Sequence, residues 1–145
     1  MDRFMRGALA GLVAGIVKEI WTLIPKYLGY TKISFIDWMG VIEFGYLPTD
    51  SLHFALAAFS HLVVLSGLGV GFAYLVPQIE SGYLVIKGVM YSLFAGAILY
   101  AMPVFFKMPY IGTVGAYTEL SNLIGSIIYG VVLAIVIQRL SSKVR

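Results

Sequence analysis

The sequence predicts an all-α, polytopic membrane protein with four transmembrane helices and a short interfacial helix between the first two. Of its 145 residues, 60% are hydrophobic and only 12% are charged. The mean hydropathy of +0.92 exceeds what a soluble core of this size can bury. Four apolar stretches of about 20 residues or more take up most of the chain, and a helix of that length crosses a hydrocarbon core of about 30 Å.

The predicted spans cover residues about 4–25, 52–76, 83–106 and 118–140. The connections are too short for a soluble module, so we expect a single transmembrane domain over residues 1–145. A short connection at 77–82 predicts that the second and third spans are antiparallel neighbours.

The first connection is long and rich in aromatic residues. Ser34 and Asp37 have the spacing of a capping box, with Asp in place of Glu, which predicts a short helix within the segment 34–46. This helix is too short to cross a membrane and too apolar for water. We expect it to lie in the outer interface with Trp38 and Tyr46 among the headgroups. A re-entrant segment buried against the bundle is the alternative.

The distribution of basic residues predicts the orientation. With four spans, both termini and the second connection share one side of the membrane, and this side has six basic residues against three on the other. The six are Arg3, Arg6, Lys87, Arg139, Lys143 and Arg145, and the three are Lys26, Lys32 and Lys107. The positive-inside rule therefore places both termini in the cytoplasm.

Small residues recur at four-residue spacing in all four spans. This spacing stacks them on one helix face, where backbones approach closely and gain van der Waals contact. We expect these faces to pack within the bundle or against other copies and other membrane proteins, so a homo-oligomer is predicted. The glycines concerned are Gly7, Gly11, Gly15, Gly67, Gly71, Gly88, Gly96 and Gly130.

The two halves of the chain show a weak internal repeat, which favours two tandem helical hairpins related by an axis along the membrane normal. Chance similarity between glycine-rich helices is the alternative. In the alignment, Arg6-Gly7 matches Lys87-Gly88, Ser60-His61-Leu62 matches Ser121-Asn122-Leu123, Gly69 matches Gly130, and Glu19 matches Tyr100.

Lys18 and Glu19 are the clearest anomaly, because ionisable side chains within a span are costly and usually face protein or a water-filled cavity. Glu19 continues the stripe of Gly7, Gly11 and Gly15 and is a candidate proton or cation site. In the structural alternative, both residues lie near the outer end and snorkel to the interface or pair across helices.

His61 lies near the middle of the second span. If the repeat is real, Glu19, His61, Tyr100 and Asn122 all lie in the outer half of the bundle and form a polar cluster beneath the first connection. Such a cluster serves either as a ligand or proton site or as a hydrogen-bonded support for helix packing. His53 and His61 are about 12 Å apart by helical rise, so no shared metal is expected, and no cofactor is predicted.

Several segments look familiar: Gly7–Lys18, Gly69–Leu75, Lys87–Tyr91 and Ile127–Leu133. Together they resemble small bacterial four-helix membrane proteins of the YqhR and YagU kind. The resemblance covers most of the chain and rests on glycine-rich helix patterns. It implies a multi-pass protein of the bacterial inner membrane and carries over no mechanism and no functional residue.

These observations favour a non-enzymatic membrane protein whose outer polar cluster handles a proton, an ion or a small ligand. The alternative is a structural or accessory subunit that packs against itself or other membrane proteins through its glycine faces. The chain has no cysteine and no recognisable catalytic constellation, and its basic residues form no nucleic-acid footprint. The lipid bilayer is the one partner that composition predicts directly.

Overall fold

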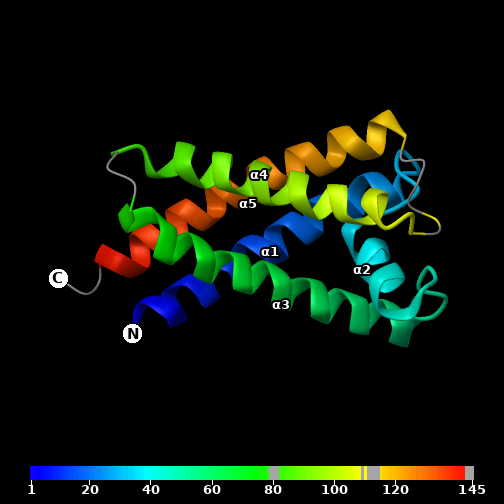
Figure 1. Ribbon diagram of the computed structural model, residues 1–145, viewed down its shortest axis with the longest axis horizontal. Coiled ribbons are helices and arrows are strands. Elements are labelled where there is room, and N and C mark those ends of the chain that lie inside the picture. The colour runs from blue at the N-terminus through cyan, green and yellow to red at the C-terminus, as the bar shows by residue number, and fades with distance from the viewer. Residues whose placement is uncertain (79–81, 109, 111–114, 143–145) are drawn as a thin grey trace.

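The computed structural model describes residues 1–78, 82–108, 110 and 115–142, and within these residues all regular structure is helical (Figure 1). Four helices are long and apolar enough to cross a membrane, as the sequence predicts: α1, α3, α4 and α5. The elements are α1 (Arg3–Tyr27), α2 (Phe35–Phe44), α3 (Ser51–Leu75), the 3₁₀ turn η1 (Val76–Gln78), α4 (Leu84–Phe105) and α5 (Ala116–Ser142).

Helices α1, α2 and α3 each begin at a side chain that accepts a hydrogen bond from the first turn; the cap of α2 is Ser34. Asp2 caps α1 through the Met5 N–H at 2.7 Å, and Asp50 caps α3 through the His53 N–H at 2.9 Å. Such caps satisfy backbone donors that the helix leaves unpaired. The His53 N–H also holds the pKa of the exposed Asp50 carboxyl below its ordinary value of 3.8.

The long helices run roughly along one direction, with both termini at one end of the bundle and α2 at the other (Figure 1). The central helix α1 packs against both α3 and α5, and α5 in turn packs against α4. The contact between α3 and α4 is sparse, although they follow each other in the chain. The expectation of antiparallel neighbours there is therefore met only in part, and the Tyr91 hydroxyl of α4 bridges to the Leu68 carbonyl of α3 at 2.8 Å.

Glycines allow the closest helix contacts, and the first of these joins α1 to α3. A Cβ added to Gly7 would lie 2.7 Å from Val70 Cα, and one added to Gly11 would lie 2.5 Å from the Leu65 carbonyl oxygen. A Cβ on Gly69 would lie 2.6 Å from Gly11 Cα. No side chain fits between backbones at these distances, which explains why the sequence needs glycine there.

The second close contact joins α4 to α5. Gly88 and Gly130 face each other, and a Cβ on either residue would collide with the backbone of the other. Beside them, the Ser92 hydroxyl donates a hydrogen bond to the Ser126 carbonyl at 2.6 Å. Gly88 and Gly130 therefore have the same role at the crossing of α4 and α5 as Gly7 and Gly69 have at the crossing of α1 and α3.

The remaining stripe glycines have varied surroundings. An added Cβ would meet Leu65 side-chain atoms at Gly15, the Tyr91 hydroxyl at Gly71 and the Ser126 hydroxyl at Gly96. Gly67 is exposed and would place a Cβ in open space. Within this chain Gly67 is therefore not a packing glycine, whereas Gly69, two residues later, is one.

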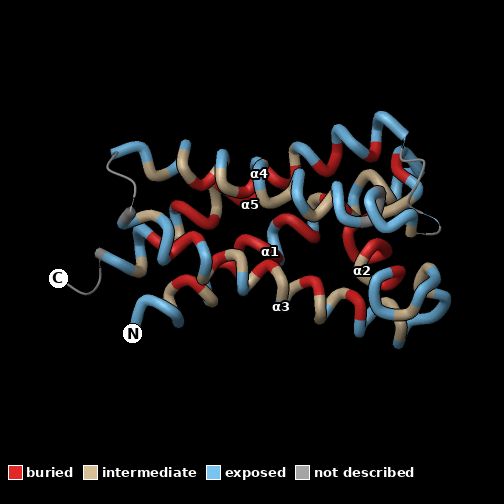
Figure 2. Tube along the Cα trace, viewed as in Figure 1, coloured by how far each residue is buried: buried red, intermediate tan, exposed pale blue. Residues whose placement is uncertain are grey.

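The exterior of this bundle differs from that of a water-soluble protein. Figure 2 shows buried residues along the inward helix faces and exposed residues on the outside. The outside carries many large apolar side chains, including Phe59, Ile86 and Phe94, while Lys18, Glu19 and His61 are buried. An apolar exterior together with buried ionisable side chains fits a hydrocarbon environment.

The short helix α2 lies against the bundle, with Phe35, Ile36, Trp38 and Val41 buried. The capping box at Ser34 is confirmed, and α2 ends at Gly45, whose left-handed φ of 80° favours glycine. Trp38 is only 4% exposed, so the expectation that it faces the headgroups is wrong. Its ring packs inward because α2 presents an aromatic face to the interior. Tyr46 is 40% exposed, and its interfacial role stays a prediction.

Candidate functional site

The centre of the candidate site is a pair of ionisable side chains from α1 and α3. Glu19 Oε1 lies 2.6 Å from His61 Nδ1, and the two residues are 7% and 4% exposed. The direction of approach is poor for a hydrogen bond, and neither Glu19 oxygen has a hydrogen-bond partner among the described residues. The pair therefore forms a close contact between two ionisable groups whose hydrogen-bonding capacity is not fully used, an unusual state for buried groups.

A third ionisable group, Lys18, completes the site. Its Nζ lies 3.7 Å from the centroid of the Phe35 ring, a cation–π contact from α1 to α2. Lys18 is 4% exposed, so the alternative in which it snorkels to the interface is wrong. The stem passes close to Gly125 of α5, where an added Cβ would lie 3.6 Å from Lys18 Cγ. Glu19 pairs across helices, as the structural interpretation of this dipeptide allowed.

The aromatic face of α2 lies between the two halves of the predicted cluster. Phe35 stacks on His61 with ring centroids 5.5 Å apart and meets Tyr100 edge-on at 5.8 Å. Trp38 contacts Tyr100 at 4.3 Å between centroids. Phe35 and Trp38 therefore connect the Glu19–His61 pair to Tyr100 through ring contacts, where the sequence led us to expect direct hydrogen bonds.

The other half of the predicted cluster is a second pair, formed by α4 and α5. The Asn122 side-chain amide donates a hydrogen bond to the Tyr100 hydroxyl, and the Glu119 carboxylate interacts with the same hydroxyl. Tyr100, Glu119 and Asn122 line a groove of about 180 Å³ between α4 and α5, together with Ser126. The groove is partly open, and the rest of its lining is apolar: Leu93, Gly96, Ala97 and Leu123.

Both pairs occupy equivalent positions in the predicted repeat. Glu19 follows Gly7 by twelve residues, as Tyr100 follows Gly88. On α3, His61 precedes Gly69 by eight residues, and on α5, Asn122 precedes Gly130 by the same number. The alignment from sequence thus matches residues that make the same kind of interhelical contact. Each hairpin has a glycine crossing and a polar pair, about 18 Å apart along α1 or α4 and about 12 Å apart along α3 or α5.

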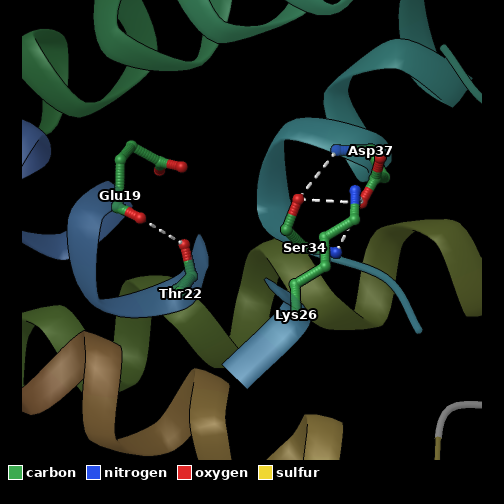
Figure 3. Close-up of polar contacts among 5 residues, drawn as sticks. All are labelled: Glu19, Thr22, Lys26, Ser34 and Asp37. Atoms are coloured by element: carbon green, nitrogen blue, oxygen red, sulfur yellow. Dashed lines mark hydrogen bonds and ion pairs between the residues drawn. The ribbon is translucent and has the colours of Figure 1, made fainter. Parts of the chain in front are cut away.

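An ion pair holds α2 in place over the site (Figure 3). Lys26 Nζ, from the last turn of α1, lies 2.5 Å from Asp37 Oδ2. The same oxygen accepts hydrogen bonds from the Ser34 backbone N–H at 2.7 Å and the Ser34 hydroxyl at 2.8 Å. The capping box therefore both starts α2 and fastens it to α1, which positions Phe35 against Lys18 and His61.

We predict that Asp37→Ala loosens α2 without unfolding the four long helices. The substitution removes three interactions of a buried carboxylate oxygen, at a cost of about 2 kcal/mol to the local stability of α2. In hydrogen exchange, the α2 amides should exchange roughly 30-fold faster, while amides near Gly69 and Gly130 stay protected. Lys26→Gln removes only the ion pair and should have a smaller effect. Unchanged exchange in α2 after Asp37→Ala would show that this tether does not hold it.

Two residues of the site were not predicted from the sequence. Phe35 lies in the aromatic-rich first connection, and Glu119 lies near the start of the fourth predicted span. Phe35 is the first residue of α2, one position after the capping Ser34, which was a usable signal for its position in the helix. The face that α2 presents to the bundle depends on Lys26 and on the packing of α1, and the local sequence does not contain this information.

The described residues contain no group of three or more His, Cys, Asp and Glu side chains that could hold a metal ion. Comparison of the chain with protein-family models, curated proteins and solved structures finds no match. Any assignment of function therefore depends on the arrangement of the side chains.

Proposed function

We propose that this chain is a multi-pass protein of the bacterial inner membrane, with both termini in the cytoplasm. The support is its four apolar helices, the apolar exterior of the bundle and the excess of basic residues at the end with the termini. In this orientation α2 and the candidate site lie toward the outer surface, and the surrounding lipid is the principal partner.

We further propose that the function is non-enzymatic and that the Glu19–His61 pair takes up and releases a proton. The observation that carries this proposal is the 2.6 Å contact between a carboxylate and an imidazole nitrogen, both buried in an apolar bundle. Imidazole titrates in the physiological range, and two ionisable groups this close exchange protons as a coupled pair. Intramembrane groups of this kind typically serve as proton relays or ion sites.

Lys18 gives this pair a defined charge balance. With Lys18 protonated, an ionised Glu19 and a neutral imidazole leave the site without net charge. A proton that enters and binds His61 adds one positive charge beside Phe35, whose ring face attracts cations. Proton uptake therefore changes the charge directly beneath α2, the element that separates the pair from the Tyr100 side of the bundle.

The alternative function, a scaffold that docks other proteins through glycine faces, has less support. The glycines with the closest contacts, Gly7, Gly11, Gly69, Gly88 and Gly130, all face helices of the same chain. Gly67 alone among the predicted packing glycines would place a Cβ in open space. Self-association through the exposed face at Gly67 stays a prediction. The matched crossings and polar pairs also support our proposal that the chain consists of two tandem helical hairpins.

Proton uptake of the reconstituted protein tests this function. In lipid nanodiscs, a pH-indicator titration from pH 5 to 9 should show about one proton more per chain for the wild type than for the double variant Glu19→Gln with His61→Asn. His61→Asn is a matched substitution because asparagine occupies the equivalent position in the second hairpin. Gly67→Ala serves as a control that leaves the site intact. Identical titration of the wild type and the folded double variant would contradict the proposal.

A further inference from the structure

A second polar pocket lies at the opposite end of the bundle, where both termini are found. Its volume is about 170 Å³, and helices α1, α3 and α5 form its walls. This volume is several times that of a water molecule and smaller than a typical site for a drug-sized ligand. Its lining includes Arg3, Arg6, Ser141, Ala73, Val76 and Ile137.

The pocket carries two guanidinium groups that have few partners of their own. Arg6 donates to the Asp2 backbone carbonyl at 3.3 Å and to the Ser141 hydroxyl at 3.4 Å. The Arg3 guanidinium lies 5.6 Å from the centroid of the Tyr74 ring. Among the described residues, neither arginine forms an ion pair with a carboxylate, and the Asp2 carboxylate caps α1. Within the part of the chain that the structure describes, two positive charges therefore line one small pocket without a carboxylate paired to either of them.

We propose that this pocket binds a phosphate group through Arg3 and Arg6, with Ser141 as a further donor. A guanidinium presents its N–H donors in a planar fork that matches two oxygens of a phosphate. Helix α1 also begins at this pocket, and the partial positive charge of a helix N-terminus favours an anion. This site is separate from the Glu19–His61 pair and does not depend on the function proposed for it.

The position of the pocket favours a lipid as the source of the phosphate. In the proposed orientation this end faces the cytoplasmic leaflet, where anionic lipids present phosphodiester headgroups at the level of the helix ends. The apolar part of the lining, from Ala73, Val76 and Ile137, suits the carbon atoms next to such a headgroup. Free phosphate shares the same recognition chemistry, so the test must separate the two sources.

Binding to the full chain in a neutral detergent provides this test. Three probes are titrated while the thermal unfolding midpoint is recorded: short-chain phosphatidylglycerol, inorganic phosphate, and the neutral detergent alone as a blank. We expect the wild type to be stabilised and the double variant Arg3→Gln with Arg6→Gln to lose roughly ten-fold or more in affinity. Lys87→Gln removes a basic residue near the same end and outside the pocket, and should change the affinity less than two-fold.

The outcomes distinguish the source of the ligand. Arginine-dependent binding of phosphatidylglycerol alone supports a lipid headgroup site, and arginine-dependent binding of inorganic phosphate supports a site for the free anion. Equal affinities in the double variant, Lys87→Gln and the wild type would overturn the proposal. If the double variant does not fold, the single variant Arg3→Gln replaces it, because Arg3 is exposed and its loss leaves the Arg6 contacts in place.

Discussion

Leucine at position 69 should separate α1 from α3 and lower the free energy of unfolding by about 3 kcal/mol or more, the upper part of the range for overpacking. The reason is that every near atom around an added Cβ at Gly69 belongs to the backbone of Gly7 or Gly11, and backbone cannot move aside as a flexible side chain can. Gly67→Leu makes the same change two residues earlier, where the space is open. We expect it to alter stability by less than about 0.5 kcal/mol.

Unfolding of both variants by denaturing detergent, followed by far-ultraviolet circular dichroism, measures this difference. Position 67 supplies a control of the same type in the same helix, so a change in overall hydrophobicity cannot account for a difference between the two. Equal stability of Gly69→Leu and Gly67→Leu would show that the α1–α3 contact is not as close as described. A matching loss is expected for Gly130→Leu, because Gly130 and Gly88 form the equivalent contact.

Glu19→Ala should be the most damaging substitution in the polar site, at about 3–5 kcal/mol. It removes the carboxylate from its 2.6 Å contact and leaves His61 and Lys18 buried without an acidic partner on α1. Glu19→Gln keeps a polar side chain of the same shape beside the imidazole. It should therefore cost clearly less, about 1–3 kcal/mol.

A double-mutant cycle with His61→Ala separates the pairwise energy from other effects of truncation. If Glu19 and His61 stabilise each other, Glu19→Ala should cost much less in the His61→Ala background, with a coupling of about 1–3 kcal/mol. Additive losses would mean that the two residues act independently and would remove the basis for a coupled proton site.

Local and periodic features made most of the helical framework predictable from the sequence. The predicted spans agree with α1, α3, α4 and α5 to within about two residues at each end, the usual uncertainty of helix boundaries. Long apolar runs leave few alternatives for a backbone that must satisfy its own hydrogen bonds in lipid. The capping box at Ser34 and Asp37 was recognised because both of its partners lie within three residues of each other.

Contacts between distant segments were harder to predict. The four-residue glycine stripe selected Gly67 and Gly71 on α3, but Gly69 makes the close contact, because spacing alone does not say which face meets α1. Snorkelling was one of the alternatives for Lys18, because nothing nearby in the sequence announces Phe35 as a partner for its ammonium group. Trp38 was assigned to the interface from residue type alone, whereas the tether between Lys26 and Asp37 turns its helix inward.

Nitrogen NMR of the two histidines in lipid nanodiscs tests the central claim most directly. His53 is partly exposed at the start of α3 and serves as an internal reference, while His61 reports on the buried pair. We predict that His61 takes up a proton as the pH is lowered and that Glu19→Gln changes the pH dependence of its signal, with the His53 signal unchanged. A His61 signal that does not titrate, or that titrates with the same midpoint in Glu19→Gln, would contradict a proton site at Glu19 and His61.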